Sequence, residues 1–236
     1  VTETKDTDKI LTVLTPDMGR IPLIARGARR KNSRIAAACQ LLAYSELTLY
    51  KRGSWYMLDE ASTVELFDGV RRDIVLLSLA SYFTELAEAV CAEETASPEI
   101  LSLLLNALYA LCYLHKEPRL VKAAFQFRLM ALAGFEPLAS GCAVCGREEP
   151  EAPMLDVVHG VVHCGGCKRQ GGLSMPLTAA GLAALRHVLY CDSRRLYGFT
   201  LEPEALRELD HAGEAFIAGQ LERSFRTLDY YKSLLI

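Results

Sequence analysis

The chain has 236 residues, a formal net charge of −3 and a hydrophobic fraction of 51%. It is long enough to bury a core in one large domain or in two to three small ones. A chain of this length does not need disulfides or metal crosslinks in every part in order to fold. No stretch of 18 apolar residues is free of charges, and residues 1–9 are polar, so we expect neither a membrane span nor a secretion signal.

Charge is distributed unevenly along the chain. Residues 1–58 carry ten Lys and Arg against five Asp and Glu, a net of +5, whereas the remainder carries a net of −8. We therefore expect a polyanionic partner to meet the N-terminal part first.

The first 70 residues are rich in β-forming side chains that alternate or cluster. Turn signals at residues 16–19 and 52–53 separate the expected strands, which cover residues 9–15, 21–28, 40–50 and 54–65. Several short strands in so short a segment predict a small β-barrel.

From residue 72 onward, apolar side chains recur at helical spacing. Ser97 precedes Pro98 as an N-cap precedes a first-turn proline, and Gly134 stands where a helix-ending glycine is expected. The expected helices cover residues 72–90, 99–115, 119–133, 178–190, 203–213 and 214–234. They form one helical domain in two parts, residues 71–139 and 173–236, with residues 140–172 inserted between them.

The insertion contains four cysteines in two CxxC pairs with 18 residues between the pairs: Cys142, Cys145, Cys164 and Cys167. This spacing is typical of a zinc ribbon, in which two tight turns joined by a hairpin, here expected at residues 157–162, complete a tetrahedral thiolate shell. Four protein ligands leave no open position, so a structural Zn²⁺ is the favoured interpretation. A catalytic metal, a redox dithiol pair, free thiols, or His159 or His163 in place of one cysteine remain as alternatives.

The other four cysteines stand apart among apolar neighbours, as buried thiols of a reducing, cytoplasmic compartment do: Cys39, Cys91, Cys112 and Cys191.

A basic segment lies between two of the expected strands. It places five cations within nine residues: Arg26, Arg29, Arg30, Lys31 and Arg34. Cations of this kind neutralise phosphates, and aromatic faces add stacking for unpaired bases. Tyr44, Tyr50, Trp55 and Tyr56 are candidates for that stacking. The alternatives are a solvated charged face for the cations and core or rim packing for the aromatic rings.

Several segments, in order along the chain, resemble the RecO family of recombination-mediator proteins. Residues 9–20 resemble the first hairpin of that family, residues 25–34 its basic segment, residues 125–137 with 142–146 its helix leading into a CxxCG turn, and residues 226–235 its closing helix. The resemblance implies an α+β multidomain fold with an N-terminal OB-fold, a helical bundle and an inserted zinc ribbon. It implies a non-enzymatic, cytoplasmic and nucleoid-associated protein that binds single- and double-stranded DNA and anneals complementary strands. It also implies that the protein, with RecR, helps RecA to replace single-stranded-DNA-binding protein.

The resemblance also assigns site residues. It places DNA on the basic segment, with Lys51 and Arg52 in a second rank. It further implies that the acidic tail of single-stranded-DNA-binding protein docks on the helical domain, where one helix offers cations beside an apolar face: Arg119, Lys122, Phe125, Arg128 and Leu129. The alternative is that Phe125 and Leu129 belong to the core.

Two other classes of function compete with this interpretation. One is a zinc hydrolase or thiol oxidoreductase, although the sequence contains no HExxH, P-loop, GxSxG or GxGxxG motif. The other is a zinc-containing adaptor that binds proteins and not DNA.

Overall fold

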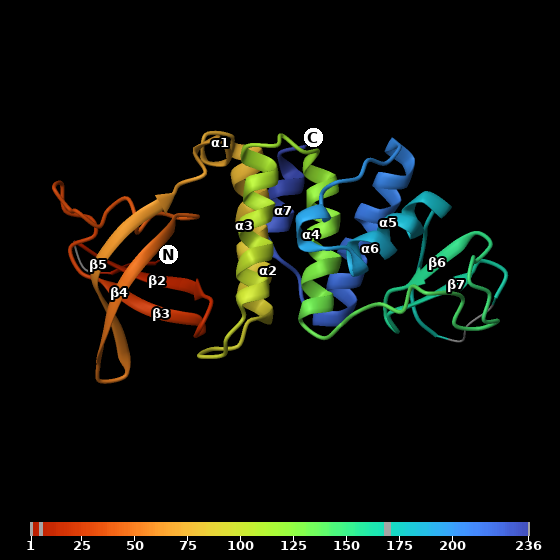
Figure 1. The fold of residues 1–236 in the computed structure, drawn as a ribbon, viewed down its shortest axis with the longest axis horizontal. Coiled ribbons are helices and arrows are strands. Elements are labelled where there is room, and N and C mark those ends of the chain that lie inside the picture. The colour runs from red at the N-terminus through yellow and green to blue at the C-terminus, as the bar shows by residue number, and fades with distance from the viewer. Residues whose placement is uncertain (1, 5–6, 168–170, 236) are drawn as a thin grey trace.

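A computed structural model describes residues 2–4, 7–167 and 171–235. Figure 1 shows three parts side by side, with a β-sheet domain at one end, a helical bundle in the middle and a smaller sheet at the other end. The architecture is α+β, with the first strands followed by helices as the sequence predicts. None of the helices within the described residues is long and apolar enough to cross a membrane.

The N-terminal domain is a five-stranded sheet with the spatial order β1-β2-β3-β5-β4. All neighbours are antiparallel except β3 and β5, which are parallel. No ladder joins β4 to β1 within the described part of the chain, so the expected closed barrel is not observed there. The strands are β1 Thr2–Thr4, β2 Asp8–Thr15, β3 Gly19–Ala25, β4 Tyr44–Arg52 and β5 Trp55–Glu65.

The connection from β3 to β4 is longer than the sequence pattern predicts. The strand expected to reach residue 28 ends at Ala25, and the strand expected from residue 40 begins at Tyr44. Gly27 causes the early end, because its φ of 67° lies in the left-handed region and its N–H donates to Asp8 Oδ1 at 2.8 Å. Residues 26–43 therefore form successive turns instead of extended strands.

Seven α-helices follow within the described chain: α1 Asp68–Arg71, α2 Ile74–Val90, α3 Pro98–Cys112, α4 Pro118–Leu132, α5 Ala179–Tyr190, α6 Pro203–Leu221 and α7 Arg226–Ser233. Aromatic pairs lie in their core, with Phe83 and Phe125 stacked at 4.3 Å between ring centroids and Phe127 and Phe216 at 5.7 Å. Gly134 ends α4 as expected: its φ is 90°, and Phe135 N donates to Met130 O at 2.8 Å, the bond of a Schellman motif. Ser97 precedes α3 as expected, but its side chain makes no capping hydrogen bond.

The predicted break between two helices at Gly213 is wrong. Helix α6 continues through Gly213 and ends only where Glu222 takes a left-handed φ of 49°. A Cβ at Gly213 would lie 2.6 Å from Gln126 Oε1 of α4, so this glycine serves the close approach of two helices and does not end one.

The third part is the insertion between α4 and α5. Its three strands are β6 Pro153–Asp156, β7 Val161–Cys164 and β8 Ser174–Pro176, in the order β7-β6-β8. The expected hairpin is present, with its turn at residues 157–160 closed by Gly160 at a φ of 64°.

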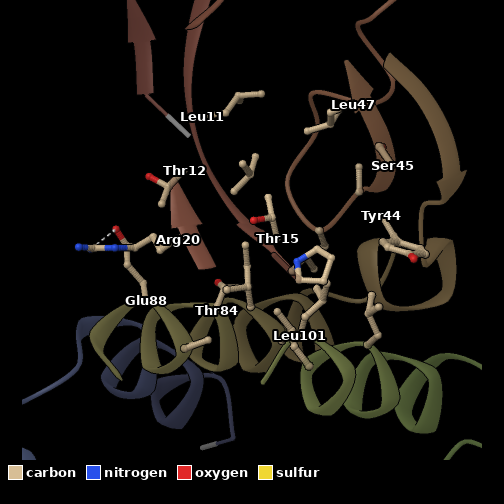
Figure 2. A pocket seen from close by; sticks show the side chains of 18 of the residues that line it. Leu11, Thr12, Thr15, Arg20, Tyr44, Ser45, Leu47, Thr84, Glu88 and Leu101 are labelled. Atoms are coloured by element: carbon tan, nitrogen blue, oxygen red, sulfur yellow. Dashed lines mark ion pairs between the residues drawn. The ribbon is translucent and has the colours of Figure 1, made fainter. Parts of the chain in front are cut away.

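A cleft of about 540 Å³ lies where the N-terminal sheet meets the bundle. Figure 2 shows side chains of β2 and of the segment around Tyr44 facing α2 and α3 across it. Its walls are largely apolar, with Leu11 and Leu47 on the side of the sheet and Leu101 on the side of the helices.

Candidate metal centre and candidate nucleic-acid interface

The four CxxC cysteines converge on one point of the insertion. Their sulfur atoms all lie within 4.8 Å of one another, and the Sγ atoms of Cys145 and Cys164 are 3.8 Å apart. A tetrahedron with Zn–S bonds of about 2.3 Å requires sulfur separations of about 3.8 Å, so the arrangement fits a single zinc ion. The separation of 3.8 Å is far longer than a disulfide bond, so these two cysteines are free thiols in this structure.

Backbone N–H groups stabilise a thiolate at Cys142 in this cluster. Cys142 Sγ accepts from the N–H groups of Cys145 at 3.5 Å and of Cys164 at 3.3 Å, the pattern of a thiolate held in a tight turn. Burial alone raises the Cys142 pKa, but these N–H donors outweigh burial and lower the pKa to about 6. A hydrogen bond with Cys145, followed by burial, raises the pKa of Cys167 to about 12. Four thiolates so close together repel one another, and a divalent cation relieves that repulsion.

The two histidines between the CxxC pairs are engaged elsewhere. His163 is buried, with Nδ1 2.8 Å from Cys164 O and Nε2 2.8 Å from Ser174 Oγ. His159 Nδ1 lies 2.6 Å from Asp156 Oδ2. The donor set is therefore four sulfurs, and neither histidine replaces a cysteine.

Two side chains from the bundle hold this centre in place. Arg186 of α5 donates to the carbonyls of Ala139 at 2.7 Å, Ser140 at 3.1 Å and Glu148 at 2.6 Å around the first CxxC turn. Gln220 of α6 donates to the carbonyls of the hairpin turn at 2.8 and 2.9 Å. The sequence reasoning missed both residues, since nothing local marks a side chain whose partners lie some 40 to 60 positions away.

All five cations of the basic segment are exposed: Arg26, Arg29, Arg30, Lys31 and Arg34. The turns between β3 and β4 carry them, and the Gly27 turn is anchored by Asp8 and by Arg29 N, which donates to Thr7 O at 2.9 Å. The segment thus presents several guanidinium groups to solvent from an anchored backbone, an arrangement suited to phosphate oxygens.

The β4–β5 hairpin adds exposed aromatic rings to this domain. Trp55 lies directly opposite Arg52 in the antiparallel ladder, and both residues are exposed. Tyr50, two residues before Arg52 on the same face of β4, is 45% exposed, and Trp55 is 44% exposed. Large exposed rings beside a cation provide the stacking chemistry that single strands require.

Lys51 and Tyr56 are placed differently from these rings. Lys51 lies 3.7 Å from Glu94 Oε1, and its Nζ lies 5.1 Å from the centroid of the Tyr56 ring. The hydroxyl of Tyr56 donates to the same Glu94 oxygen at 3.0 Å. Of the cations assigned to DNA, Lys51 is therefore already paired with an acid of the bundle.

The docking surface expected on α4 is not formed in this structure. Phe125 and Leu129 are fully buried in the bundle core, and Lys122 is 2% exposed, paired with Asp210 at 3.0 Å and with Glu214. Arg128 is half-buried and donates to Cys191 O at 2.5 Å, which leaves Arg119 as the exposed member of the five. The apolar stripe of α4 packs against other helices. A stripe that packs in a core and a stripe that binds a partner have the same sequence pattern, so the sequence does not distinguish them.

Comparison with known proteins divides the chain close to the start of the bundle. The family model described as "Recombination protein O N terminal" matches residues 1–67, and that described as "Recombination protein O C terminal" matches residues 71–229. The chain is 31% identical over 237 residues to "DNA repair protein RecO" of Symbiobacterium thermophilum, covering 98% of this chain and 92% of that protein. Proteins of the same description from Desulforudis audaxviator and Acetivibrio thermocellus are 30% and 27% identical over 230 and 231 residues, each with 98% and 92% of the two chains covered.

Proposed function

The chain belongs to the RecO family of DNA repair and recombination proteins, and we propose that it binds DNA through its N-terminal sheet domain as a recombination mediator. The observation that carries this proposal is the basic segment, whose five cations are all exposed on one anchored connection between β3 and β4. Its guanidinium groups neutralise phosphates without reading base sequence, so both single-stranded and double-stranded DNA are substrates for binding.

Strand annealing follows from the same electrostatics. Two complementary strands repel each other through their phosphates, and a cationic surface that contacts both removes much of that repulsion. The exposed Trp55 and Tyr50 hold unpaired bases by stacking, which favours single strands before they pair. No side chain of this proposal transfers a proton or forms a covalent bond, so the proposed activity is binding and annealing and not catalysis.

The proposed cellular role follows from family membership. The protein works in the cytoplasm on nucleoid DNA, with RecR, and helps RecA to load on strands coated by single-stranded-DNA-binding protein. We also propose that the N-terminal domain is of the OB type, a module that commonly binds single strands. The buried face of α4 is not proposed as the docking site for the tail of single-stranded-DNA-binding protein.

Zinc has a structural role in this proposal. Cys142, Cys145, Cys164 and Cys167 would hold the ion, which would supply a closed four-thiolate crosslink between the two turns of the insertion. A closed shell favours a staple over a hydrolytic centre, because no ligand position is left for water.

Fluorescence anisotropy of a labelled single-stranded oligonucleotide, measured at several salt concentrations, tests DNA binding. The double variant Arg29→Glu/Arg30→Glu should lose most of the affinity, and wild-type binding should fall steeply with salt. Arg194→Glu/Arg195→Glu is the matched control, because it reverses another adjacent pair of exposed arginines, located in the bundle. Equal loss in both double variants would show that total charge, and not the basic segment, governs binding. Absence of binding at low salt would instead favour the protein-binding adaptor.

A further inference from the structure

The α2–α3 connection extends from the bundle to the N-terminal sheet and places acidic side chains against it. Glu93 Oε1 lies 2.9 Å from Arg20 Nη2, and Glu94 contacts both Lys51 and Tyr56. Arg20 also lies 3.7 Å from Glu88 of α2, the pair joined by a dashed line in Figure 2. Acids of the bundle therefore neutralise two cations of the basic domain.

Glu94 reaches its partners from an uncommon backbone conformation. Its φ is 53°, in the left-handed region that residues with a Cβ rarely adopt. The carboxylate is nevertheless shared between the Tyr56 hydroxyl at 3.0 Å and Lys51 Nζ at 3.7 Å. The side-chain contacts with the sheet thus hold Glu94 in an unfavourable backbone conformation. Release of the Glu94 side chain would allow this backbone to relax.

The rest of the connection is weakly attached to the sheet. Residues 92–96 are all exposed. The backbone hydrogen bonds that tie the connection to the sheet are long: Glu94 N to Arg20 O and Arg20 N to Ala92 O at 3.4 Å, and Ser97 N to Pro16 O at 3.3 Å. Typical N–H···O distances are about 2.9 Å, so these backbone bonds are weak, and ion pairs between side chains this exposed add only a modest further attachment.

The chemistry around the Glu94 carboxylate is that of a phosphate site. An ammonium group and a phenolic hydroxyl converge on one anionic oxygen, and both groups are common donors to nucleic-acid phosphates. The same β4–β5 hairpin carries the exposed rings Tyr50 and Trp55. Lys51 and Tyr56 alternate with Tyr50 and Trp55 along the two strands, so they lie on the opposite face of the hairpin and form a site separate from the stacking rings.

We propose that Lys51 and Tyr56 form a second phosphate subsite for nucleic acid, separate from the basic segment, which Glu94 occupies in the free protein. The Glu94 carboxylate takes the place of a phosphate oxygen, so a bound strand fills the subsite only by displacing residues 92–96. This inference rests on the proposed DNA-binding function. Its consequence is an intramolecular competitor that lowers affinity and couples DNA binding to the contact between sheet and bundle.

Anisotropy titration of a labelled single-stranded oligonucleotide with Glu94→Gln tests the competition. The variant should bind about two- to fivefold more tightly than the wild type, the range that measured exposed ion pairs span. Glu60→Gln is the matched control, since it removes the same charge from an exposed position of β5, in the sheet domain that carries Lys51 and Tyr56. In a Lys51→Met background, Glu94→Gln should give no further gain, because the subsite no longer holds a cation.

Two outcomes would overturn the inference while leaving DNA binding itself intact. One is an equal effect of Glu94→Gln and Glu60→Gln, which would show that the gain in affinity comes from the loss of any negative charge and not from removal of a competitor. The other is unchanged amide exchange at Glu94 and Ser97 when the oligonucleotide is added, since displacement should speed exchange at both. Failure of the proposed function looks different: wild-type protein would not bind, or Arg29→Glu/Arg30→Glu would bind as well as wild type.

Discussion

Replacing Lys122 by Met should destabilise the protein strongly, although the side chains are of similar length. Lys122 Nζ pairs with Asp210 at 3.0 Å and with Glu214, and lies 5.6 Å from the centroid of the Tyr231 ring. The side chains of Lys122 and Asp210 are 2% and 7% exposed. Methionine fills much of the same volume but leaves two carboxylates without their buried cation.

The expected loss is about 3–5 kcal/mol of unfolding free energy, which is the usual cost of removing one partner of a buried ion pair. Thermal and urea unfolding monitored by circular dichroism measure it. Lys232→Met is the matched control: Lys232 lies 2.7 Å from the same Glu214, but its side chain is 54% exposed, so its loss should cost about 1 kcal/mol or less. The triple variant Lys122→Met/Asp210→Asn/Glu214→Gln should recover much of the lost stability, because no uncompensated buried charge remains.

The loss should also depend on pH. In the wild type, burial raises the pKa of Asp210 despite Lys122, whereas Lys122 and Lys232 outweigh burial at Glu214 and hold its pKa below the usual value. Without Lys122, burial and mutual repulsion raise the pKa of both carboxyls in the folded state. A folded state that binds extra protons is stabilised as pH falls, so the deficit of Lys122→Met should shrink between pH 8 and pH 5. A loss of unfolding free energy below about 1 kcal/mol, or a loss that grows as pH falls, would refute the proposed role of Lys122 as the buried partner of Asp210 and Glu214.

Further predictions concern the metal centre and the hairpin. Chelation of zinc, or Cys164→Ser, should lower the melting temperature and release the metal, measured by calorimetry with a colorimetric zinc assay; unchanged melting would contradict the staple. Arg186→Ala should lower the unfolding free energy, measured in urea, by about 2 kcal/mol because several charged hydrogen bonds are lost. The control Arg147→Ala removes a half-exposed ion pair with Glu151 and should cost less than about 1 kcal/mol. Equal costs would show that Arg186 does not hold the CxxC turn. Trp55 is the only tryptophan, so its fluorescence should be quenched when a single-stranded oligonucleotide stacks on it, and Trp55→Ala should weaken binding by about 1 kcal/mol or more; unaltered fluorescence at saturation would exclude stacking there.

Because α5 and α6 contact the cysteine cluster, a zinc ion bound there would affect more than the insertion. Arg186 donates hydrogen bonds to carbonyls around the first CxxC turn, and Gln220 donates to carbonyls of the hairpin turn, so both helices depend on the shape of the insertion. Loss of the ion should therefore loosen the adjoining part of the bundle as well as the insertion.

Local chemistry in the sequence determined much of this protein. The CxxC spacing predicted the cluster of four sulfurs, and Gly134 predicted the end of α4, because a tight turn and a left-handed cap depend on a few adjacent residues. The run of cations predicted an exposed segment, since five charges in nine residues have no means of burial together.

Only the tertiary structure decided which face of each helix is covered and which charges meet. The sequence predicts a helix end at Gly213 because no local pattern shows that α4 packs there, and it predicts an accessible cation at Lys122 because Glu214, its partner, is 92 positions away. Glu94 and Lys51 likewise come together only when the bundle docks on the sheet. These contacts join residues far apart in the chain, and their energy depends on burial and on partners that no local pattern specifies.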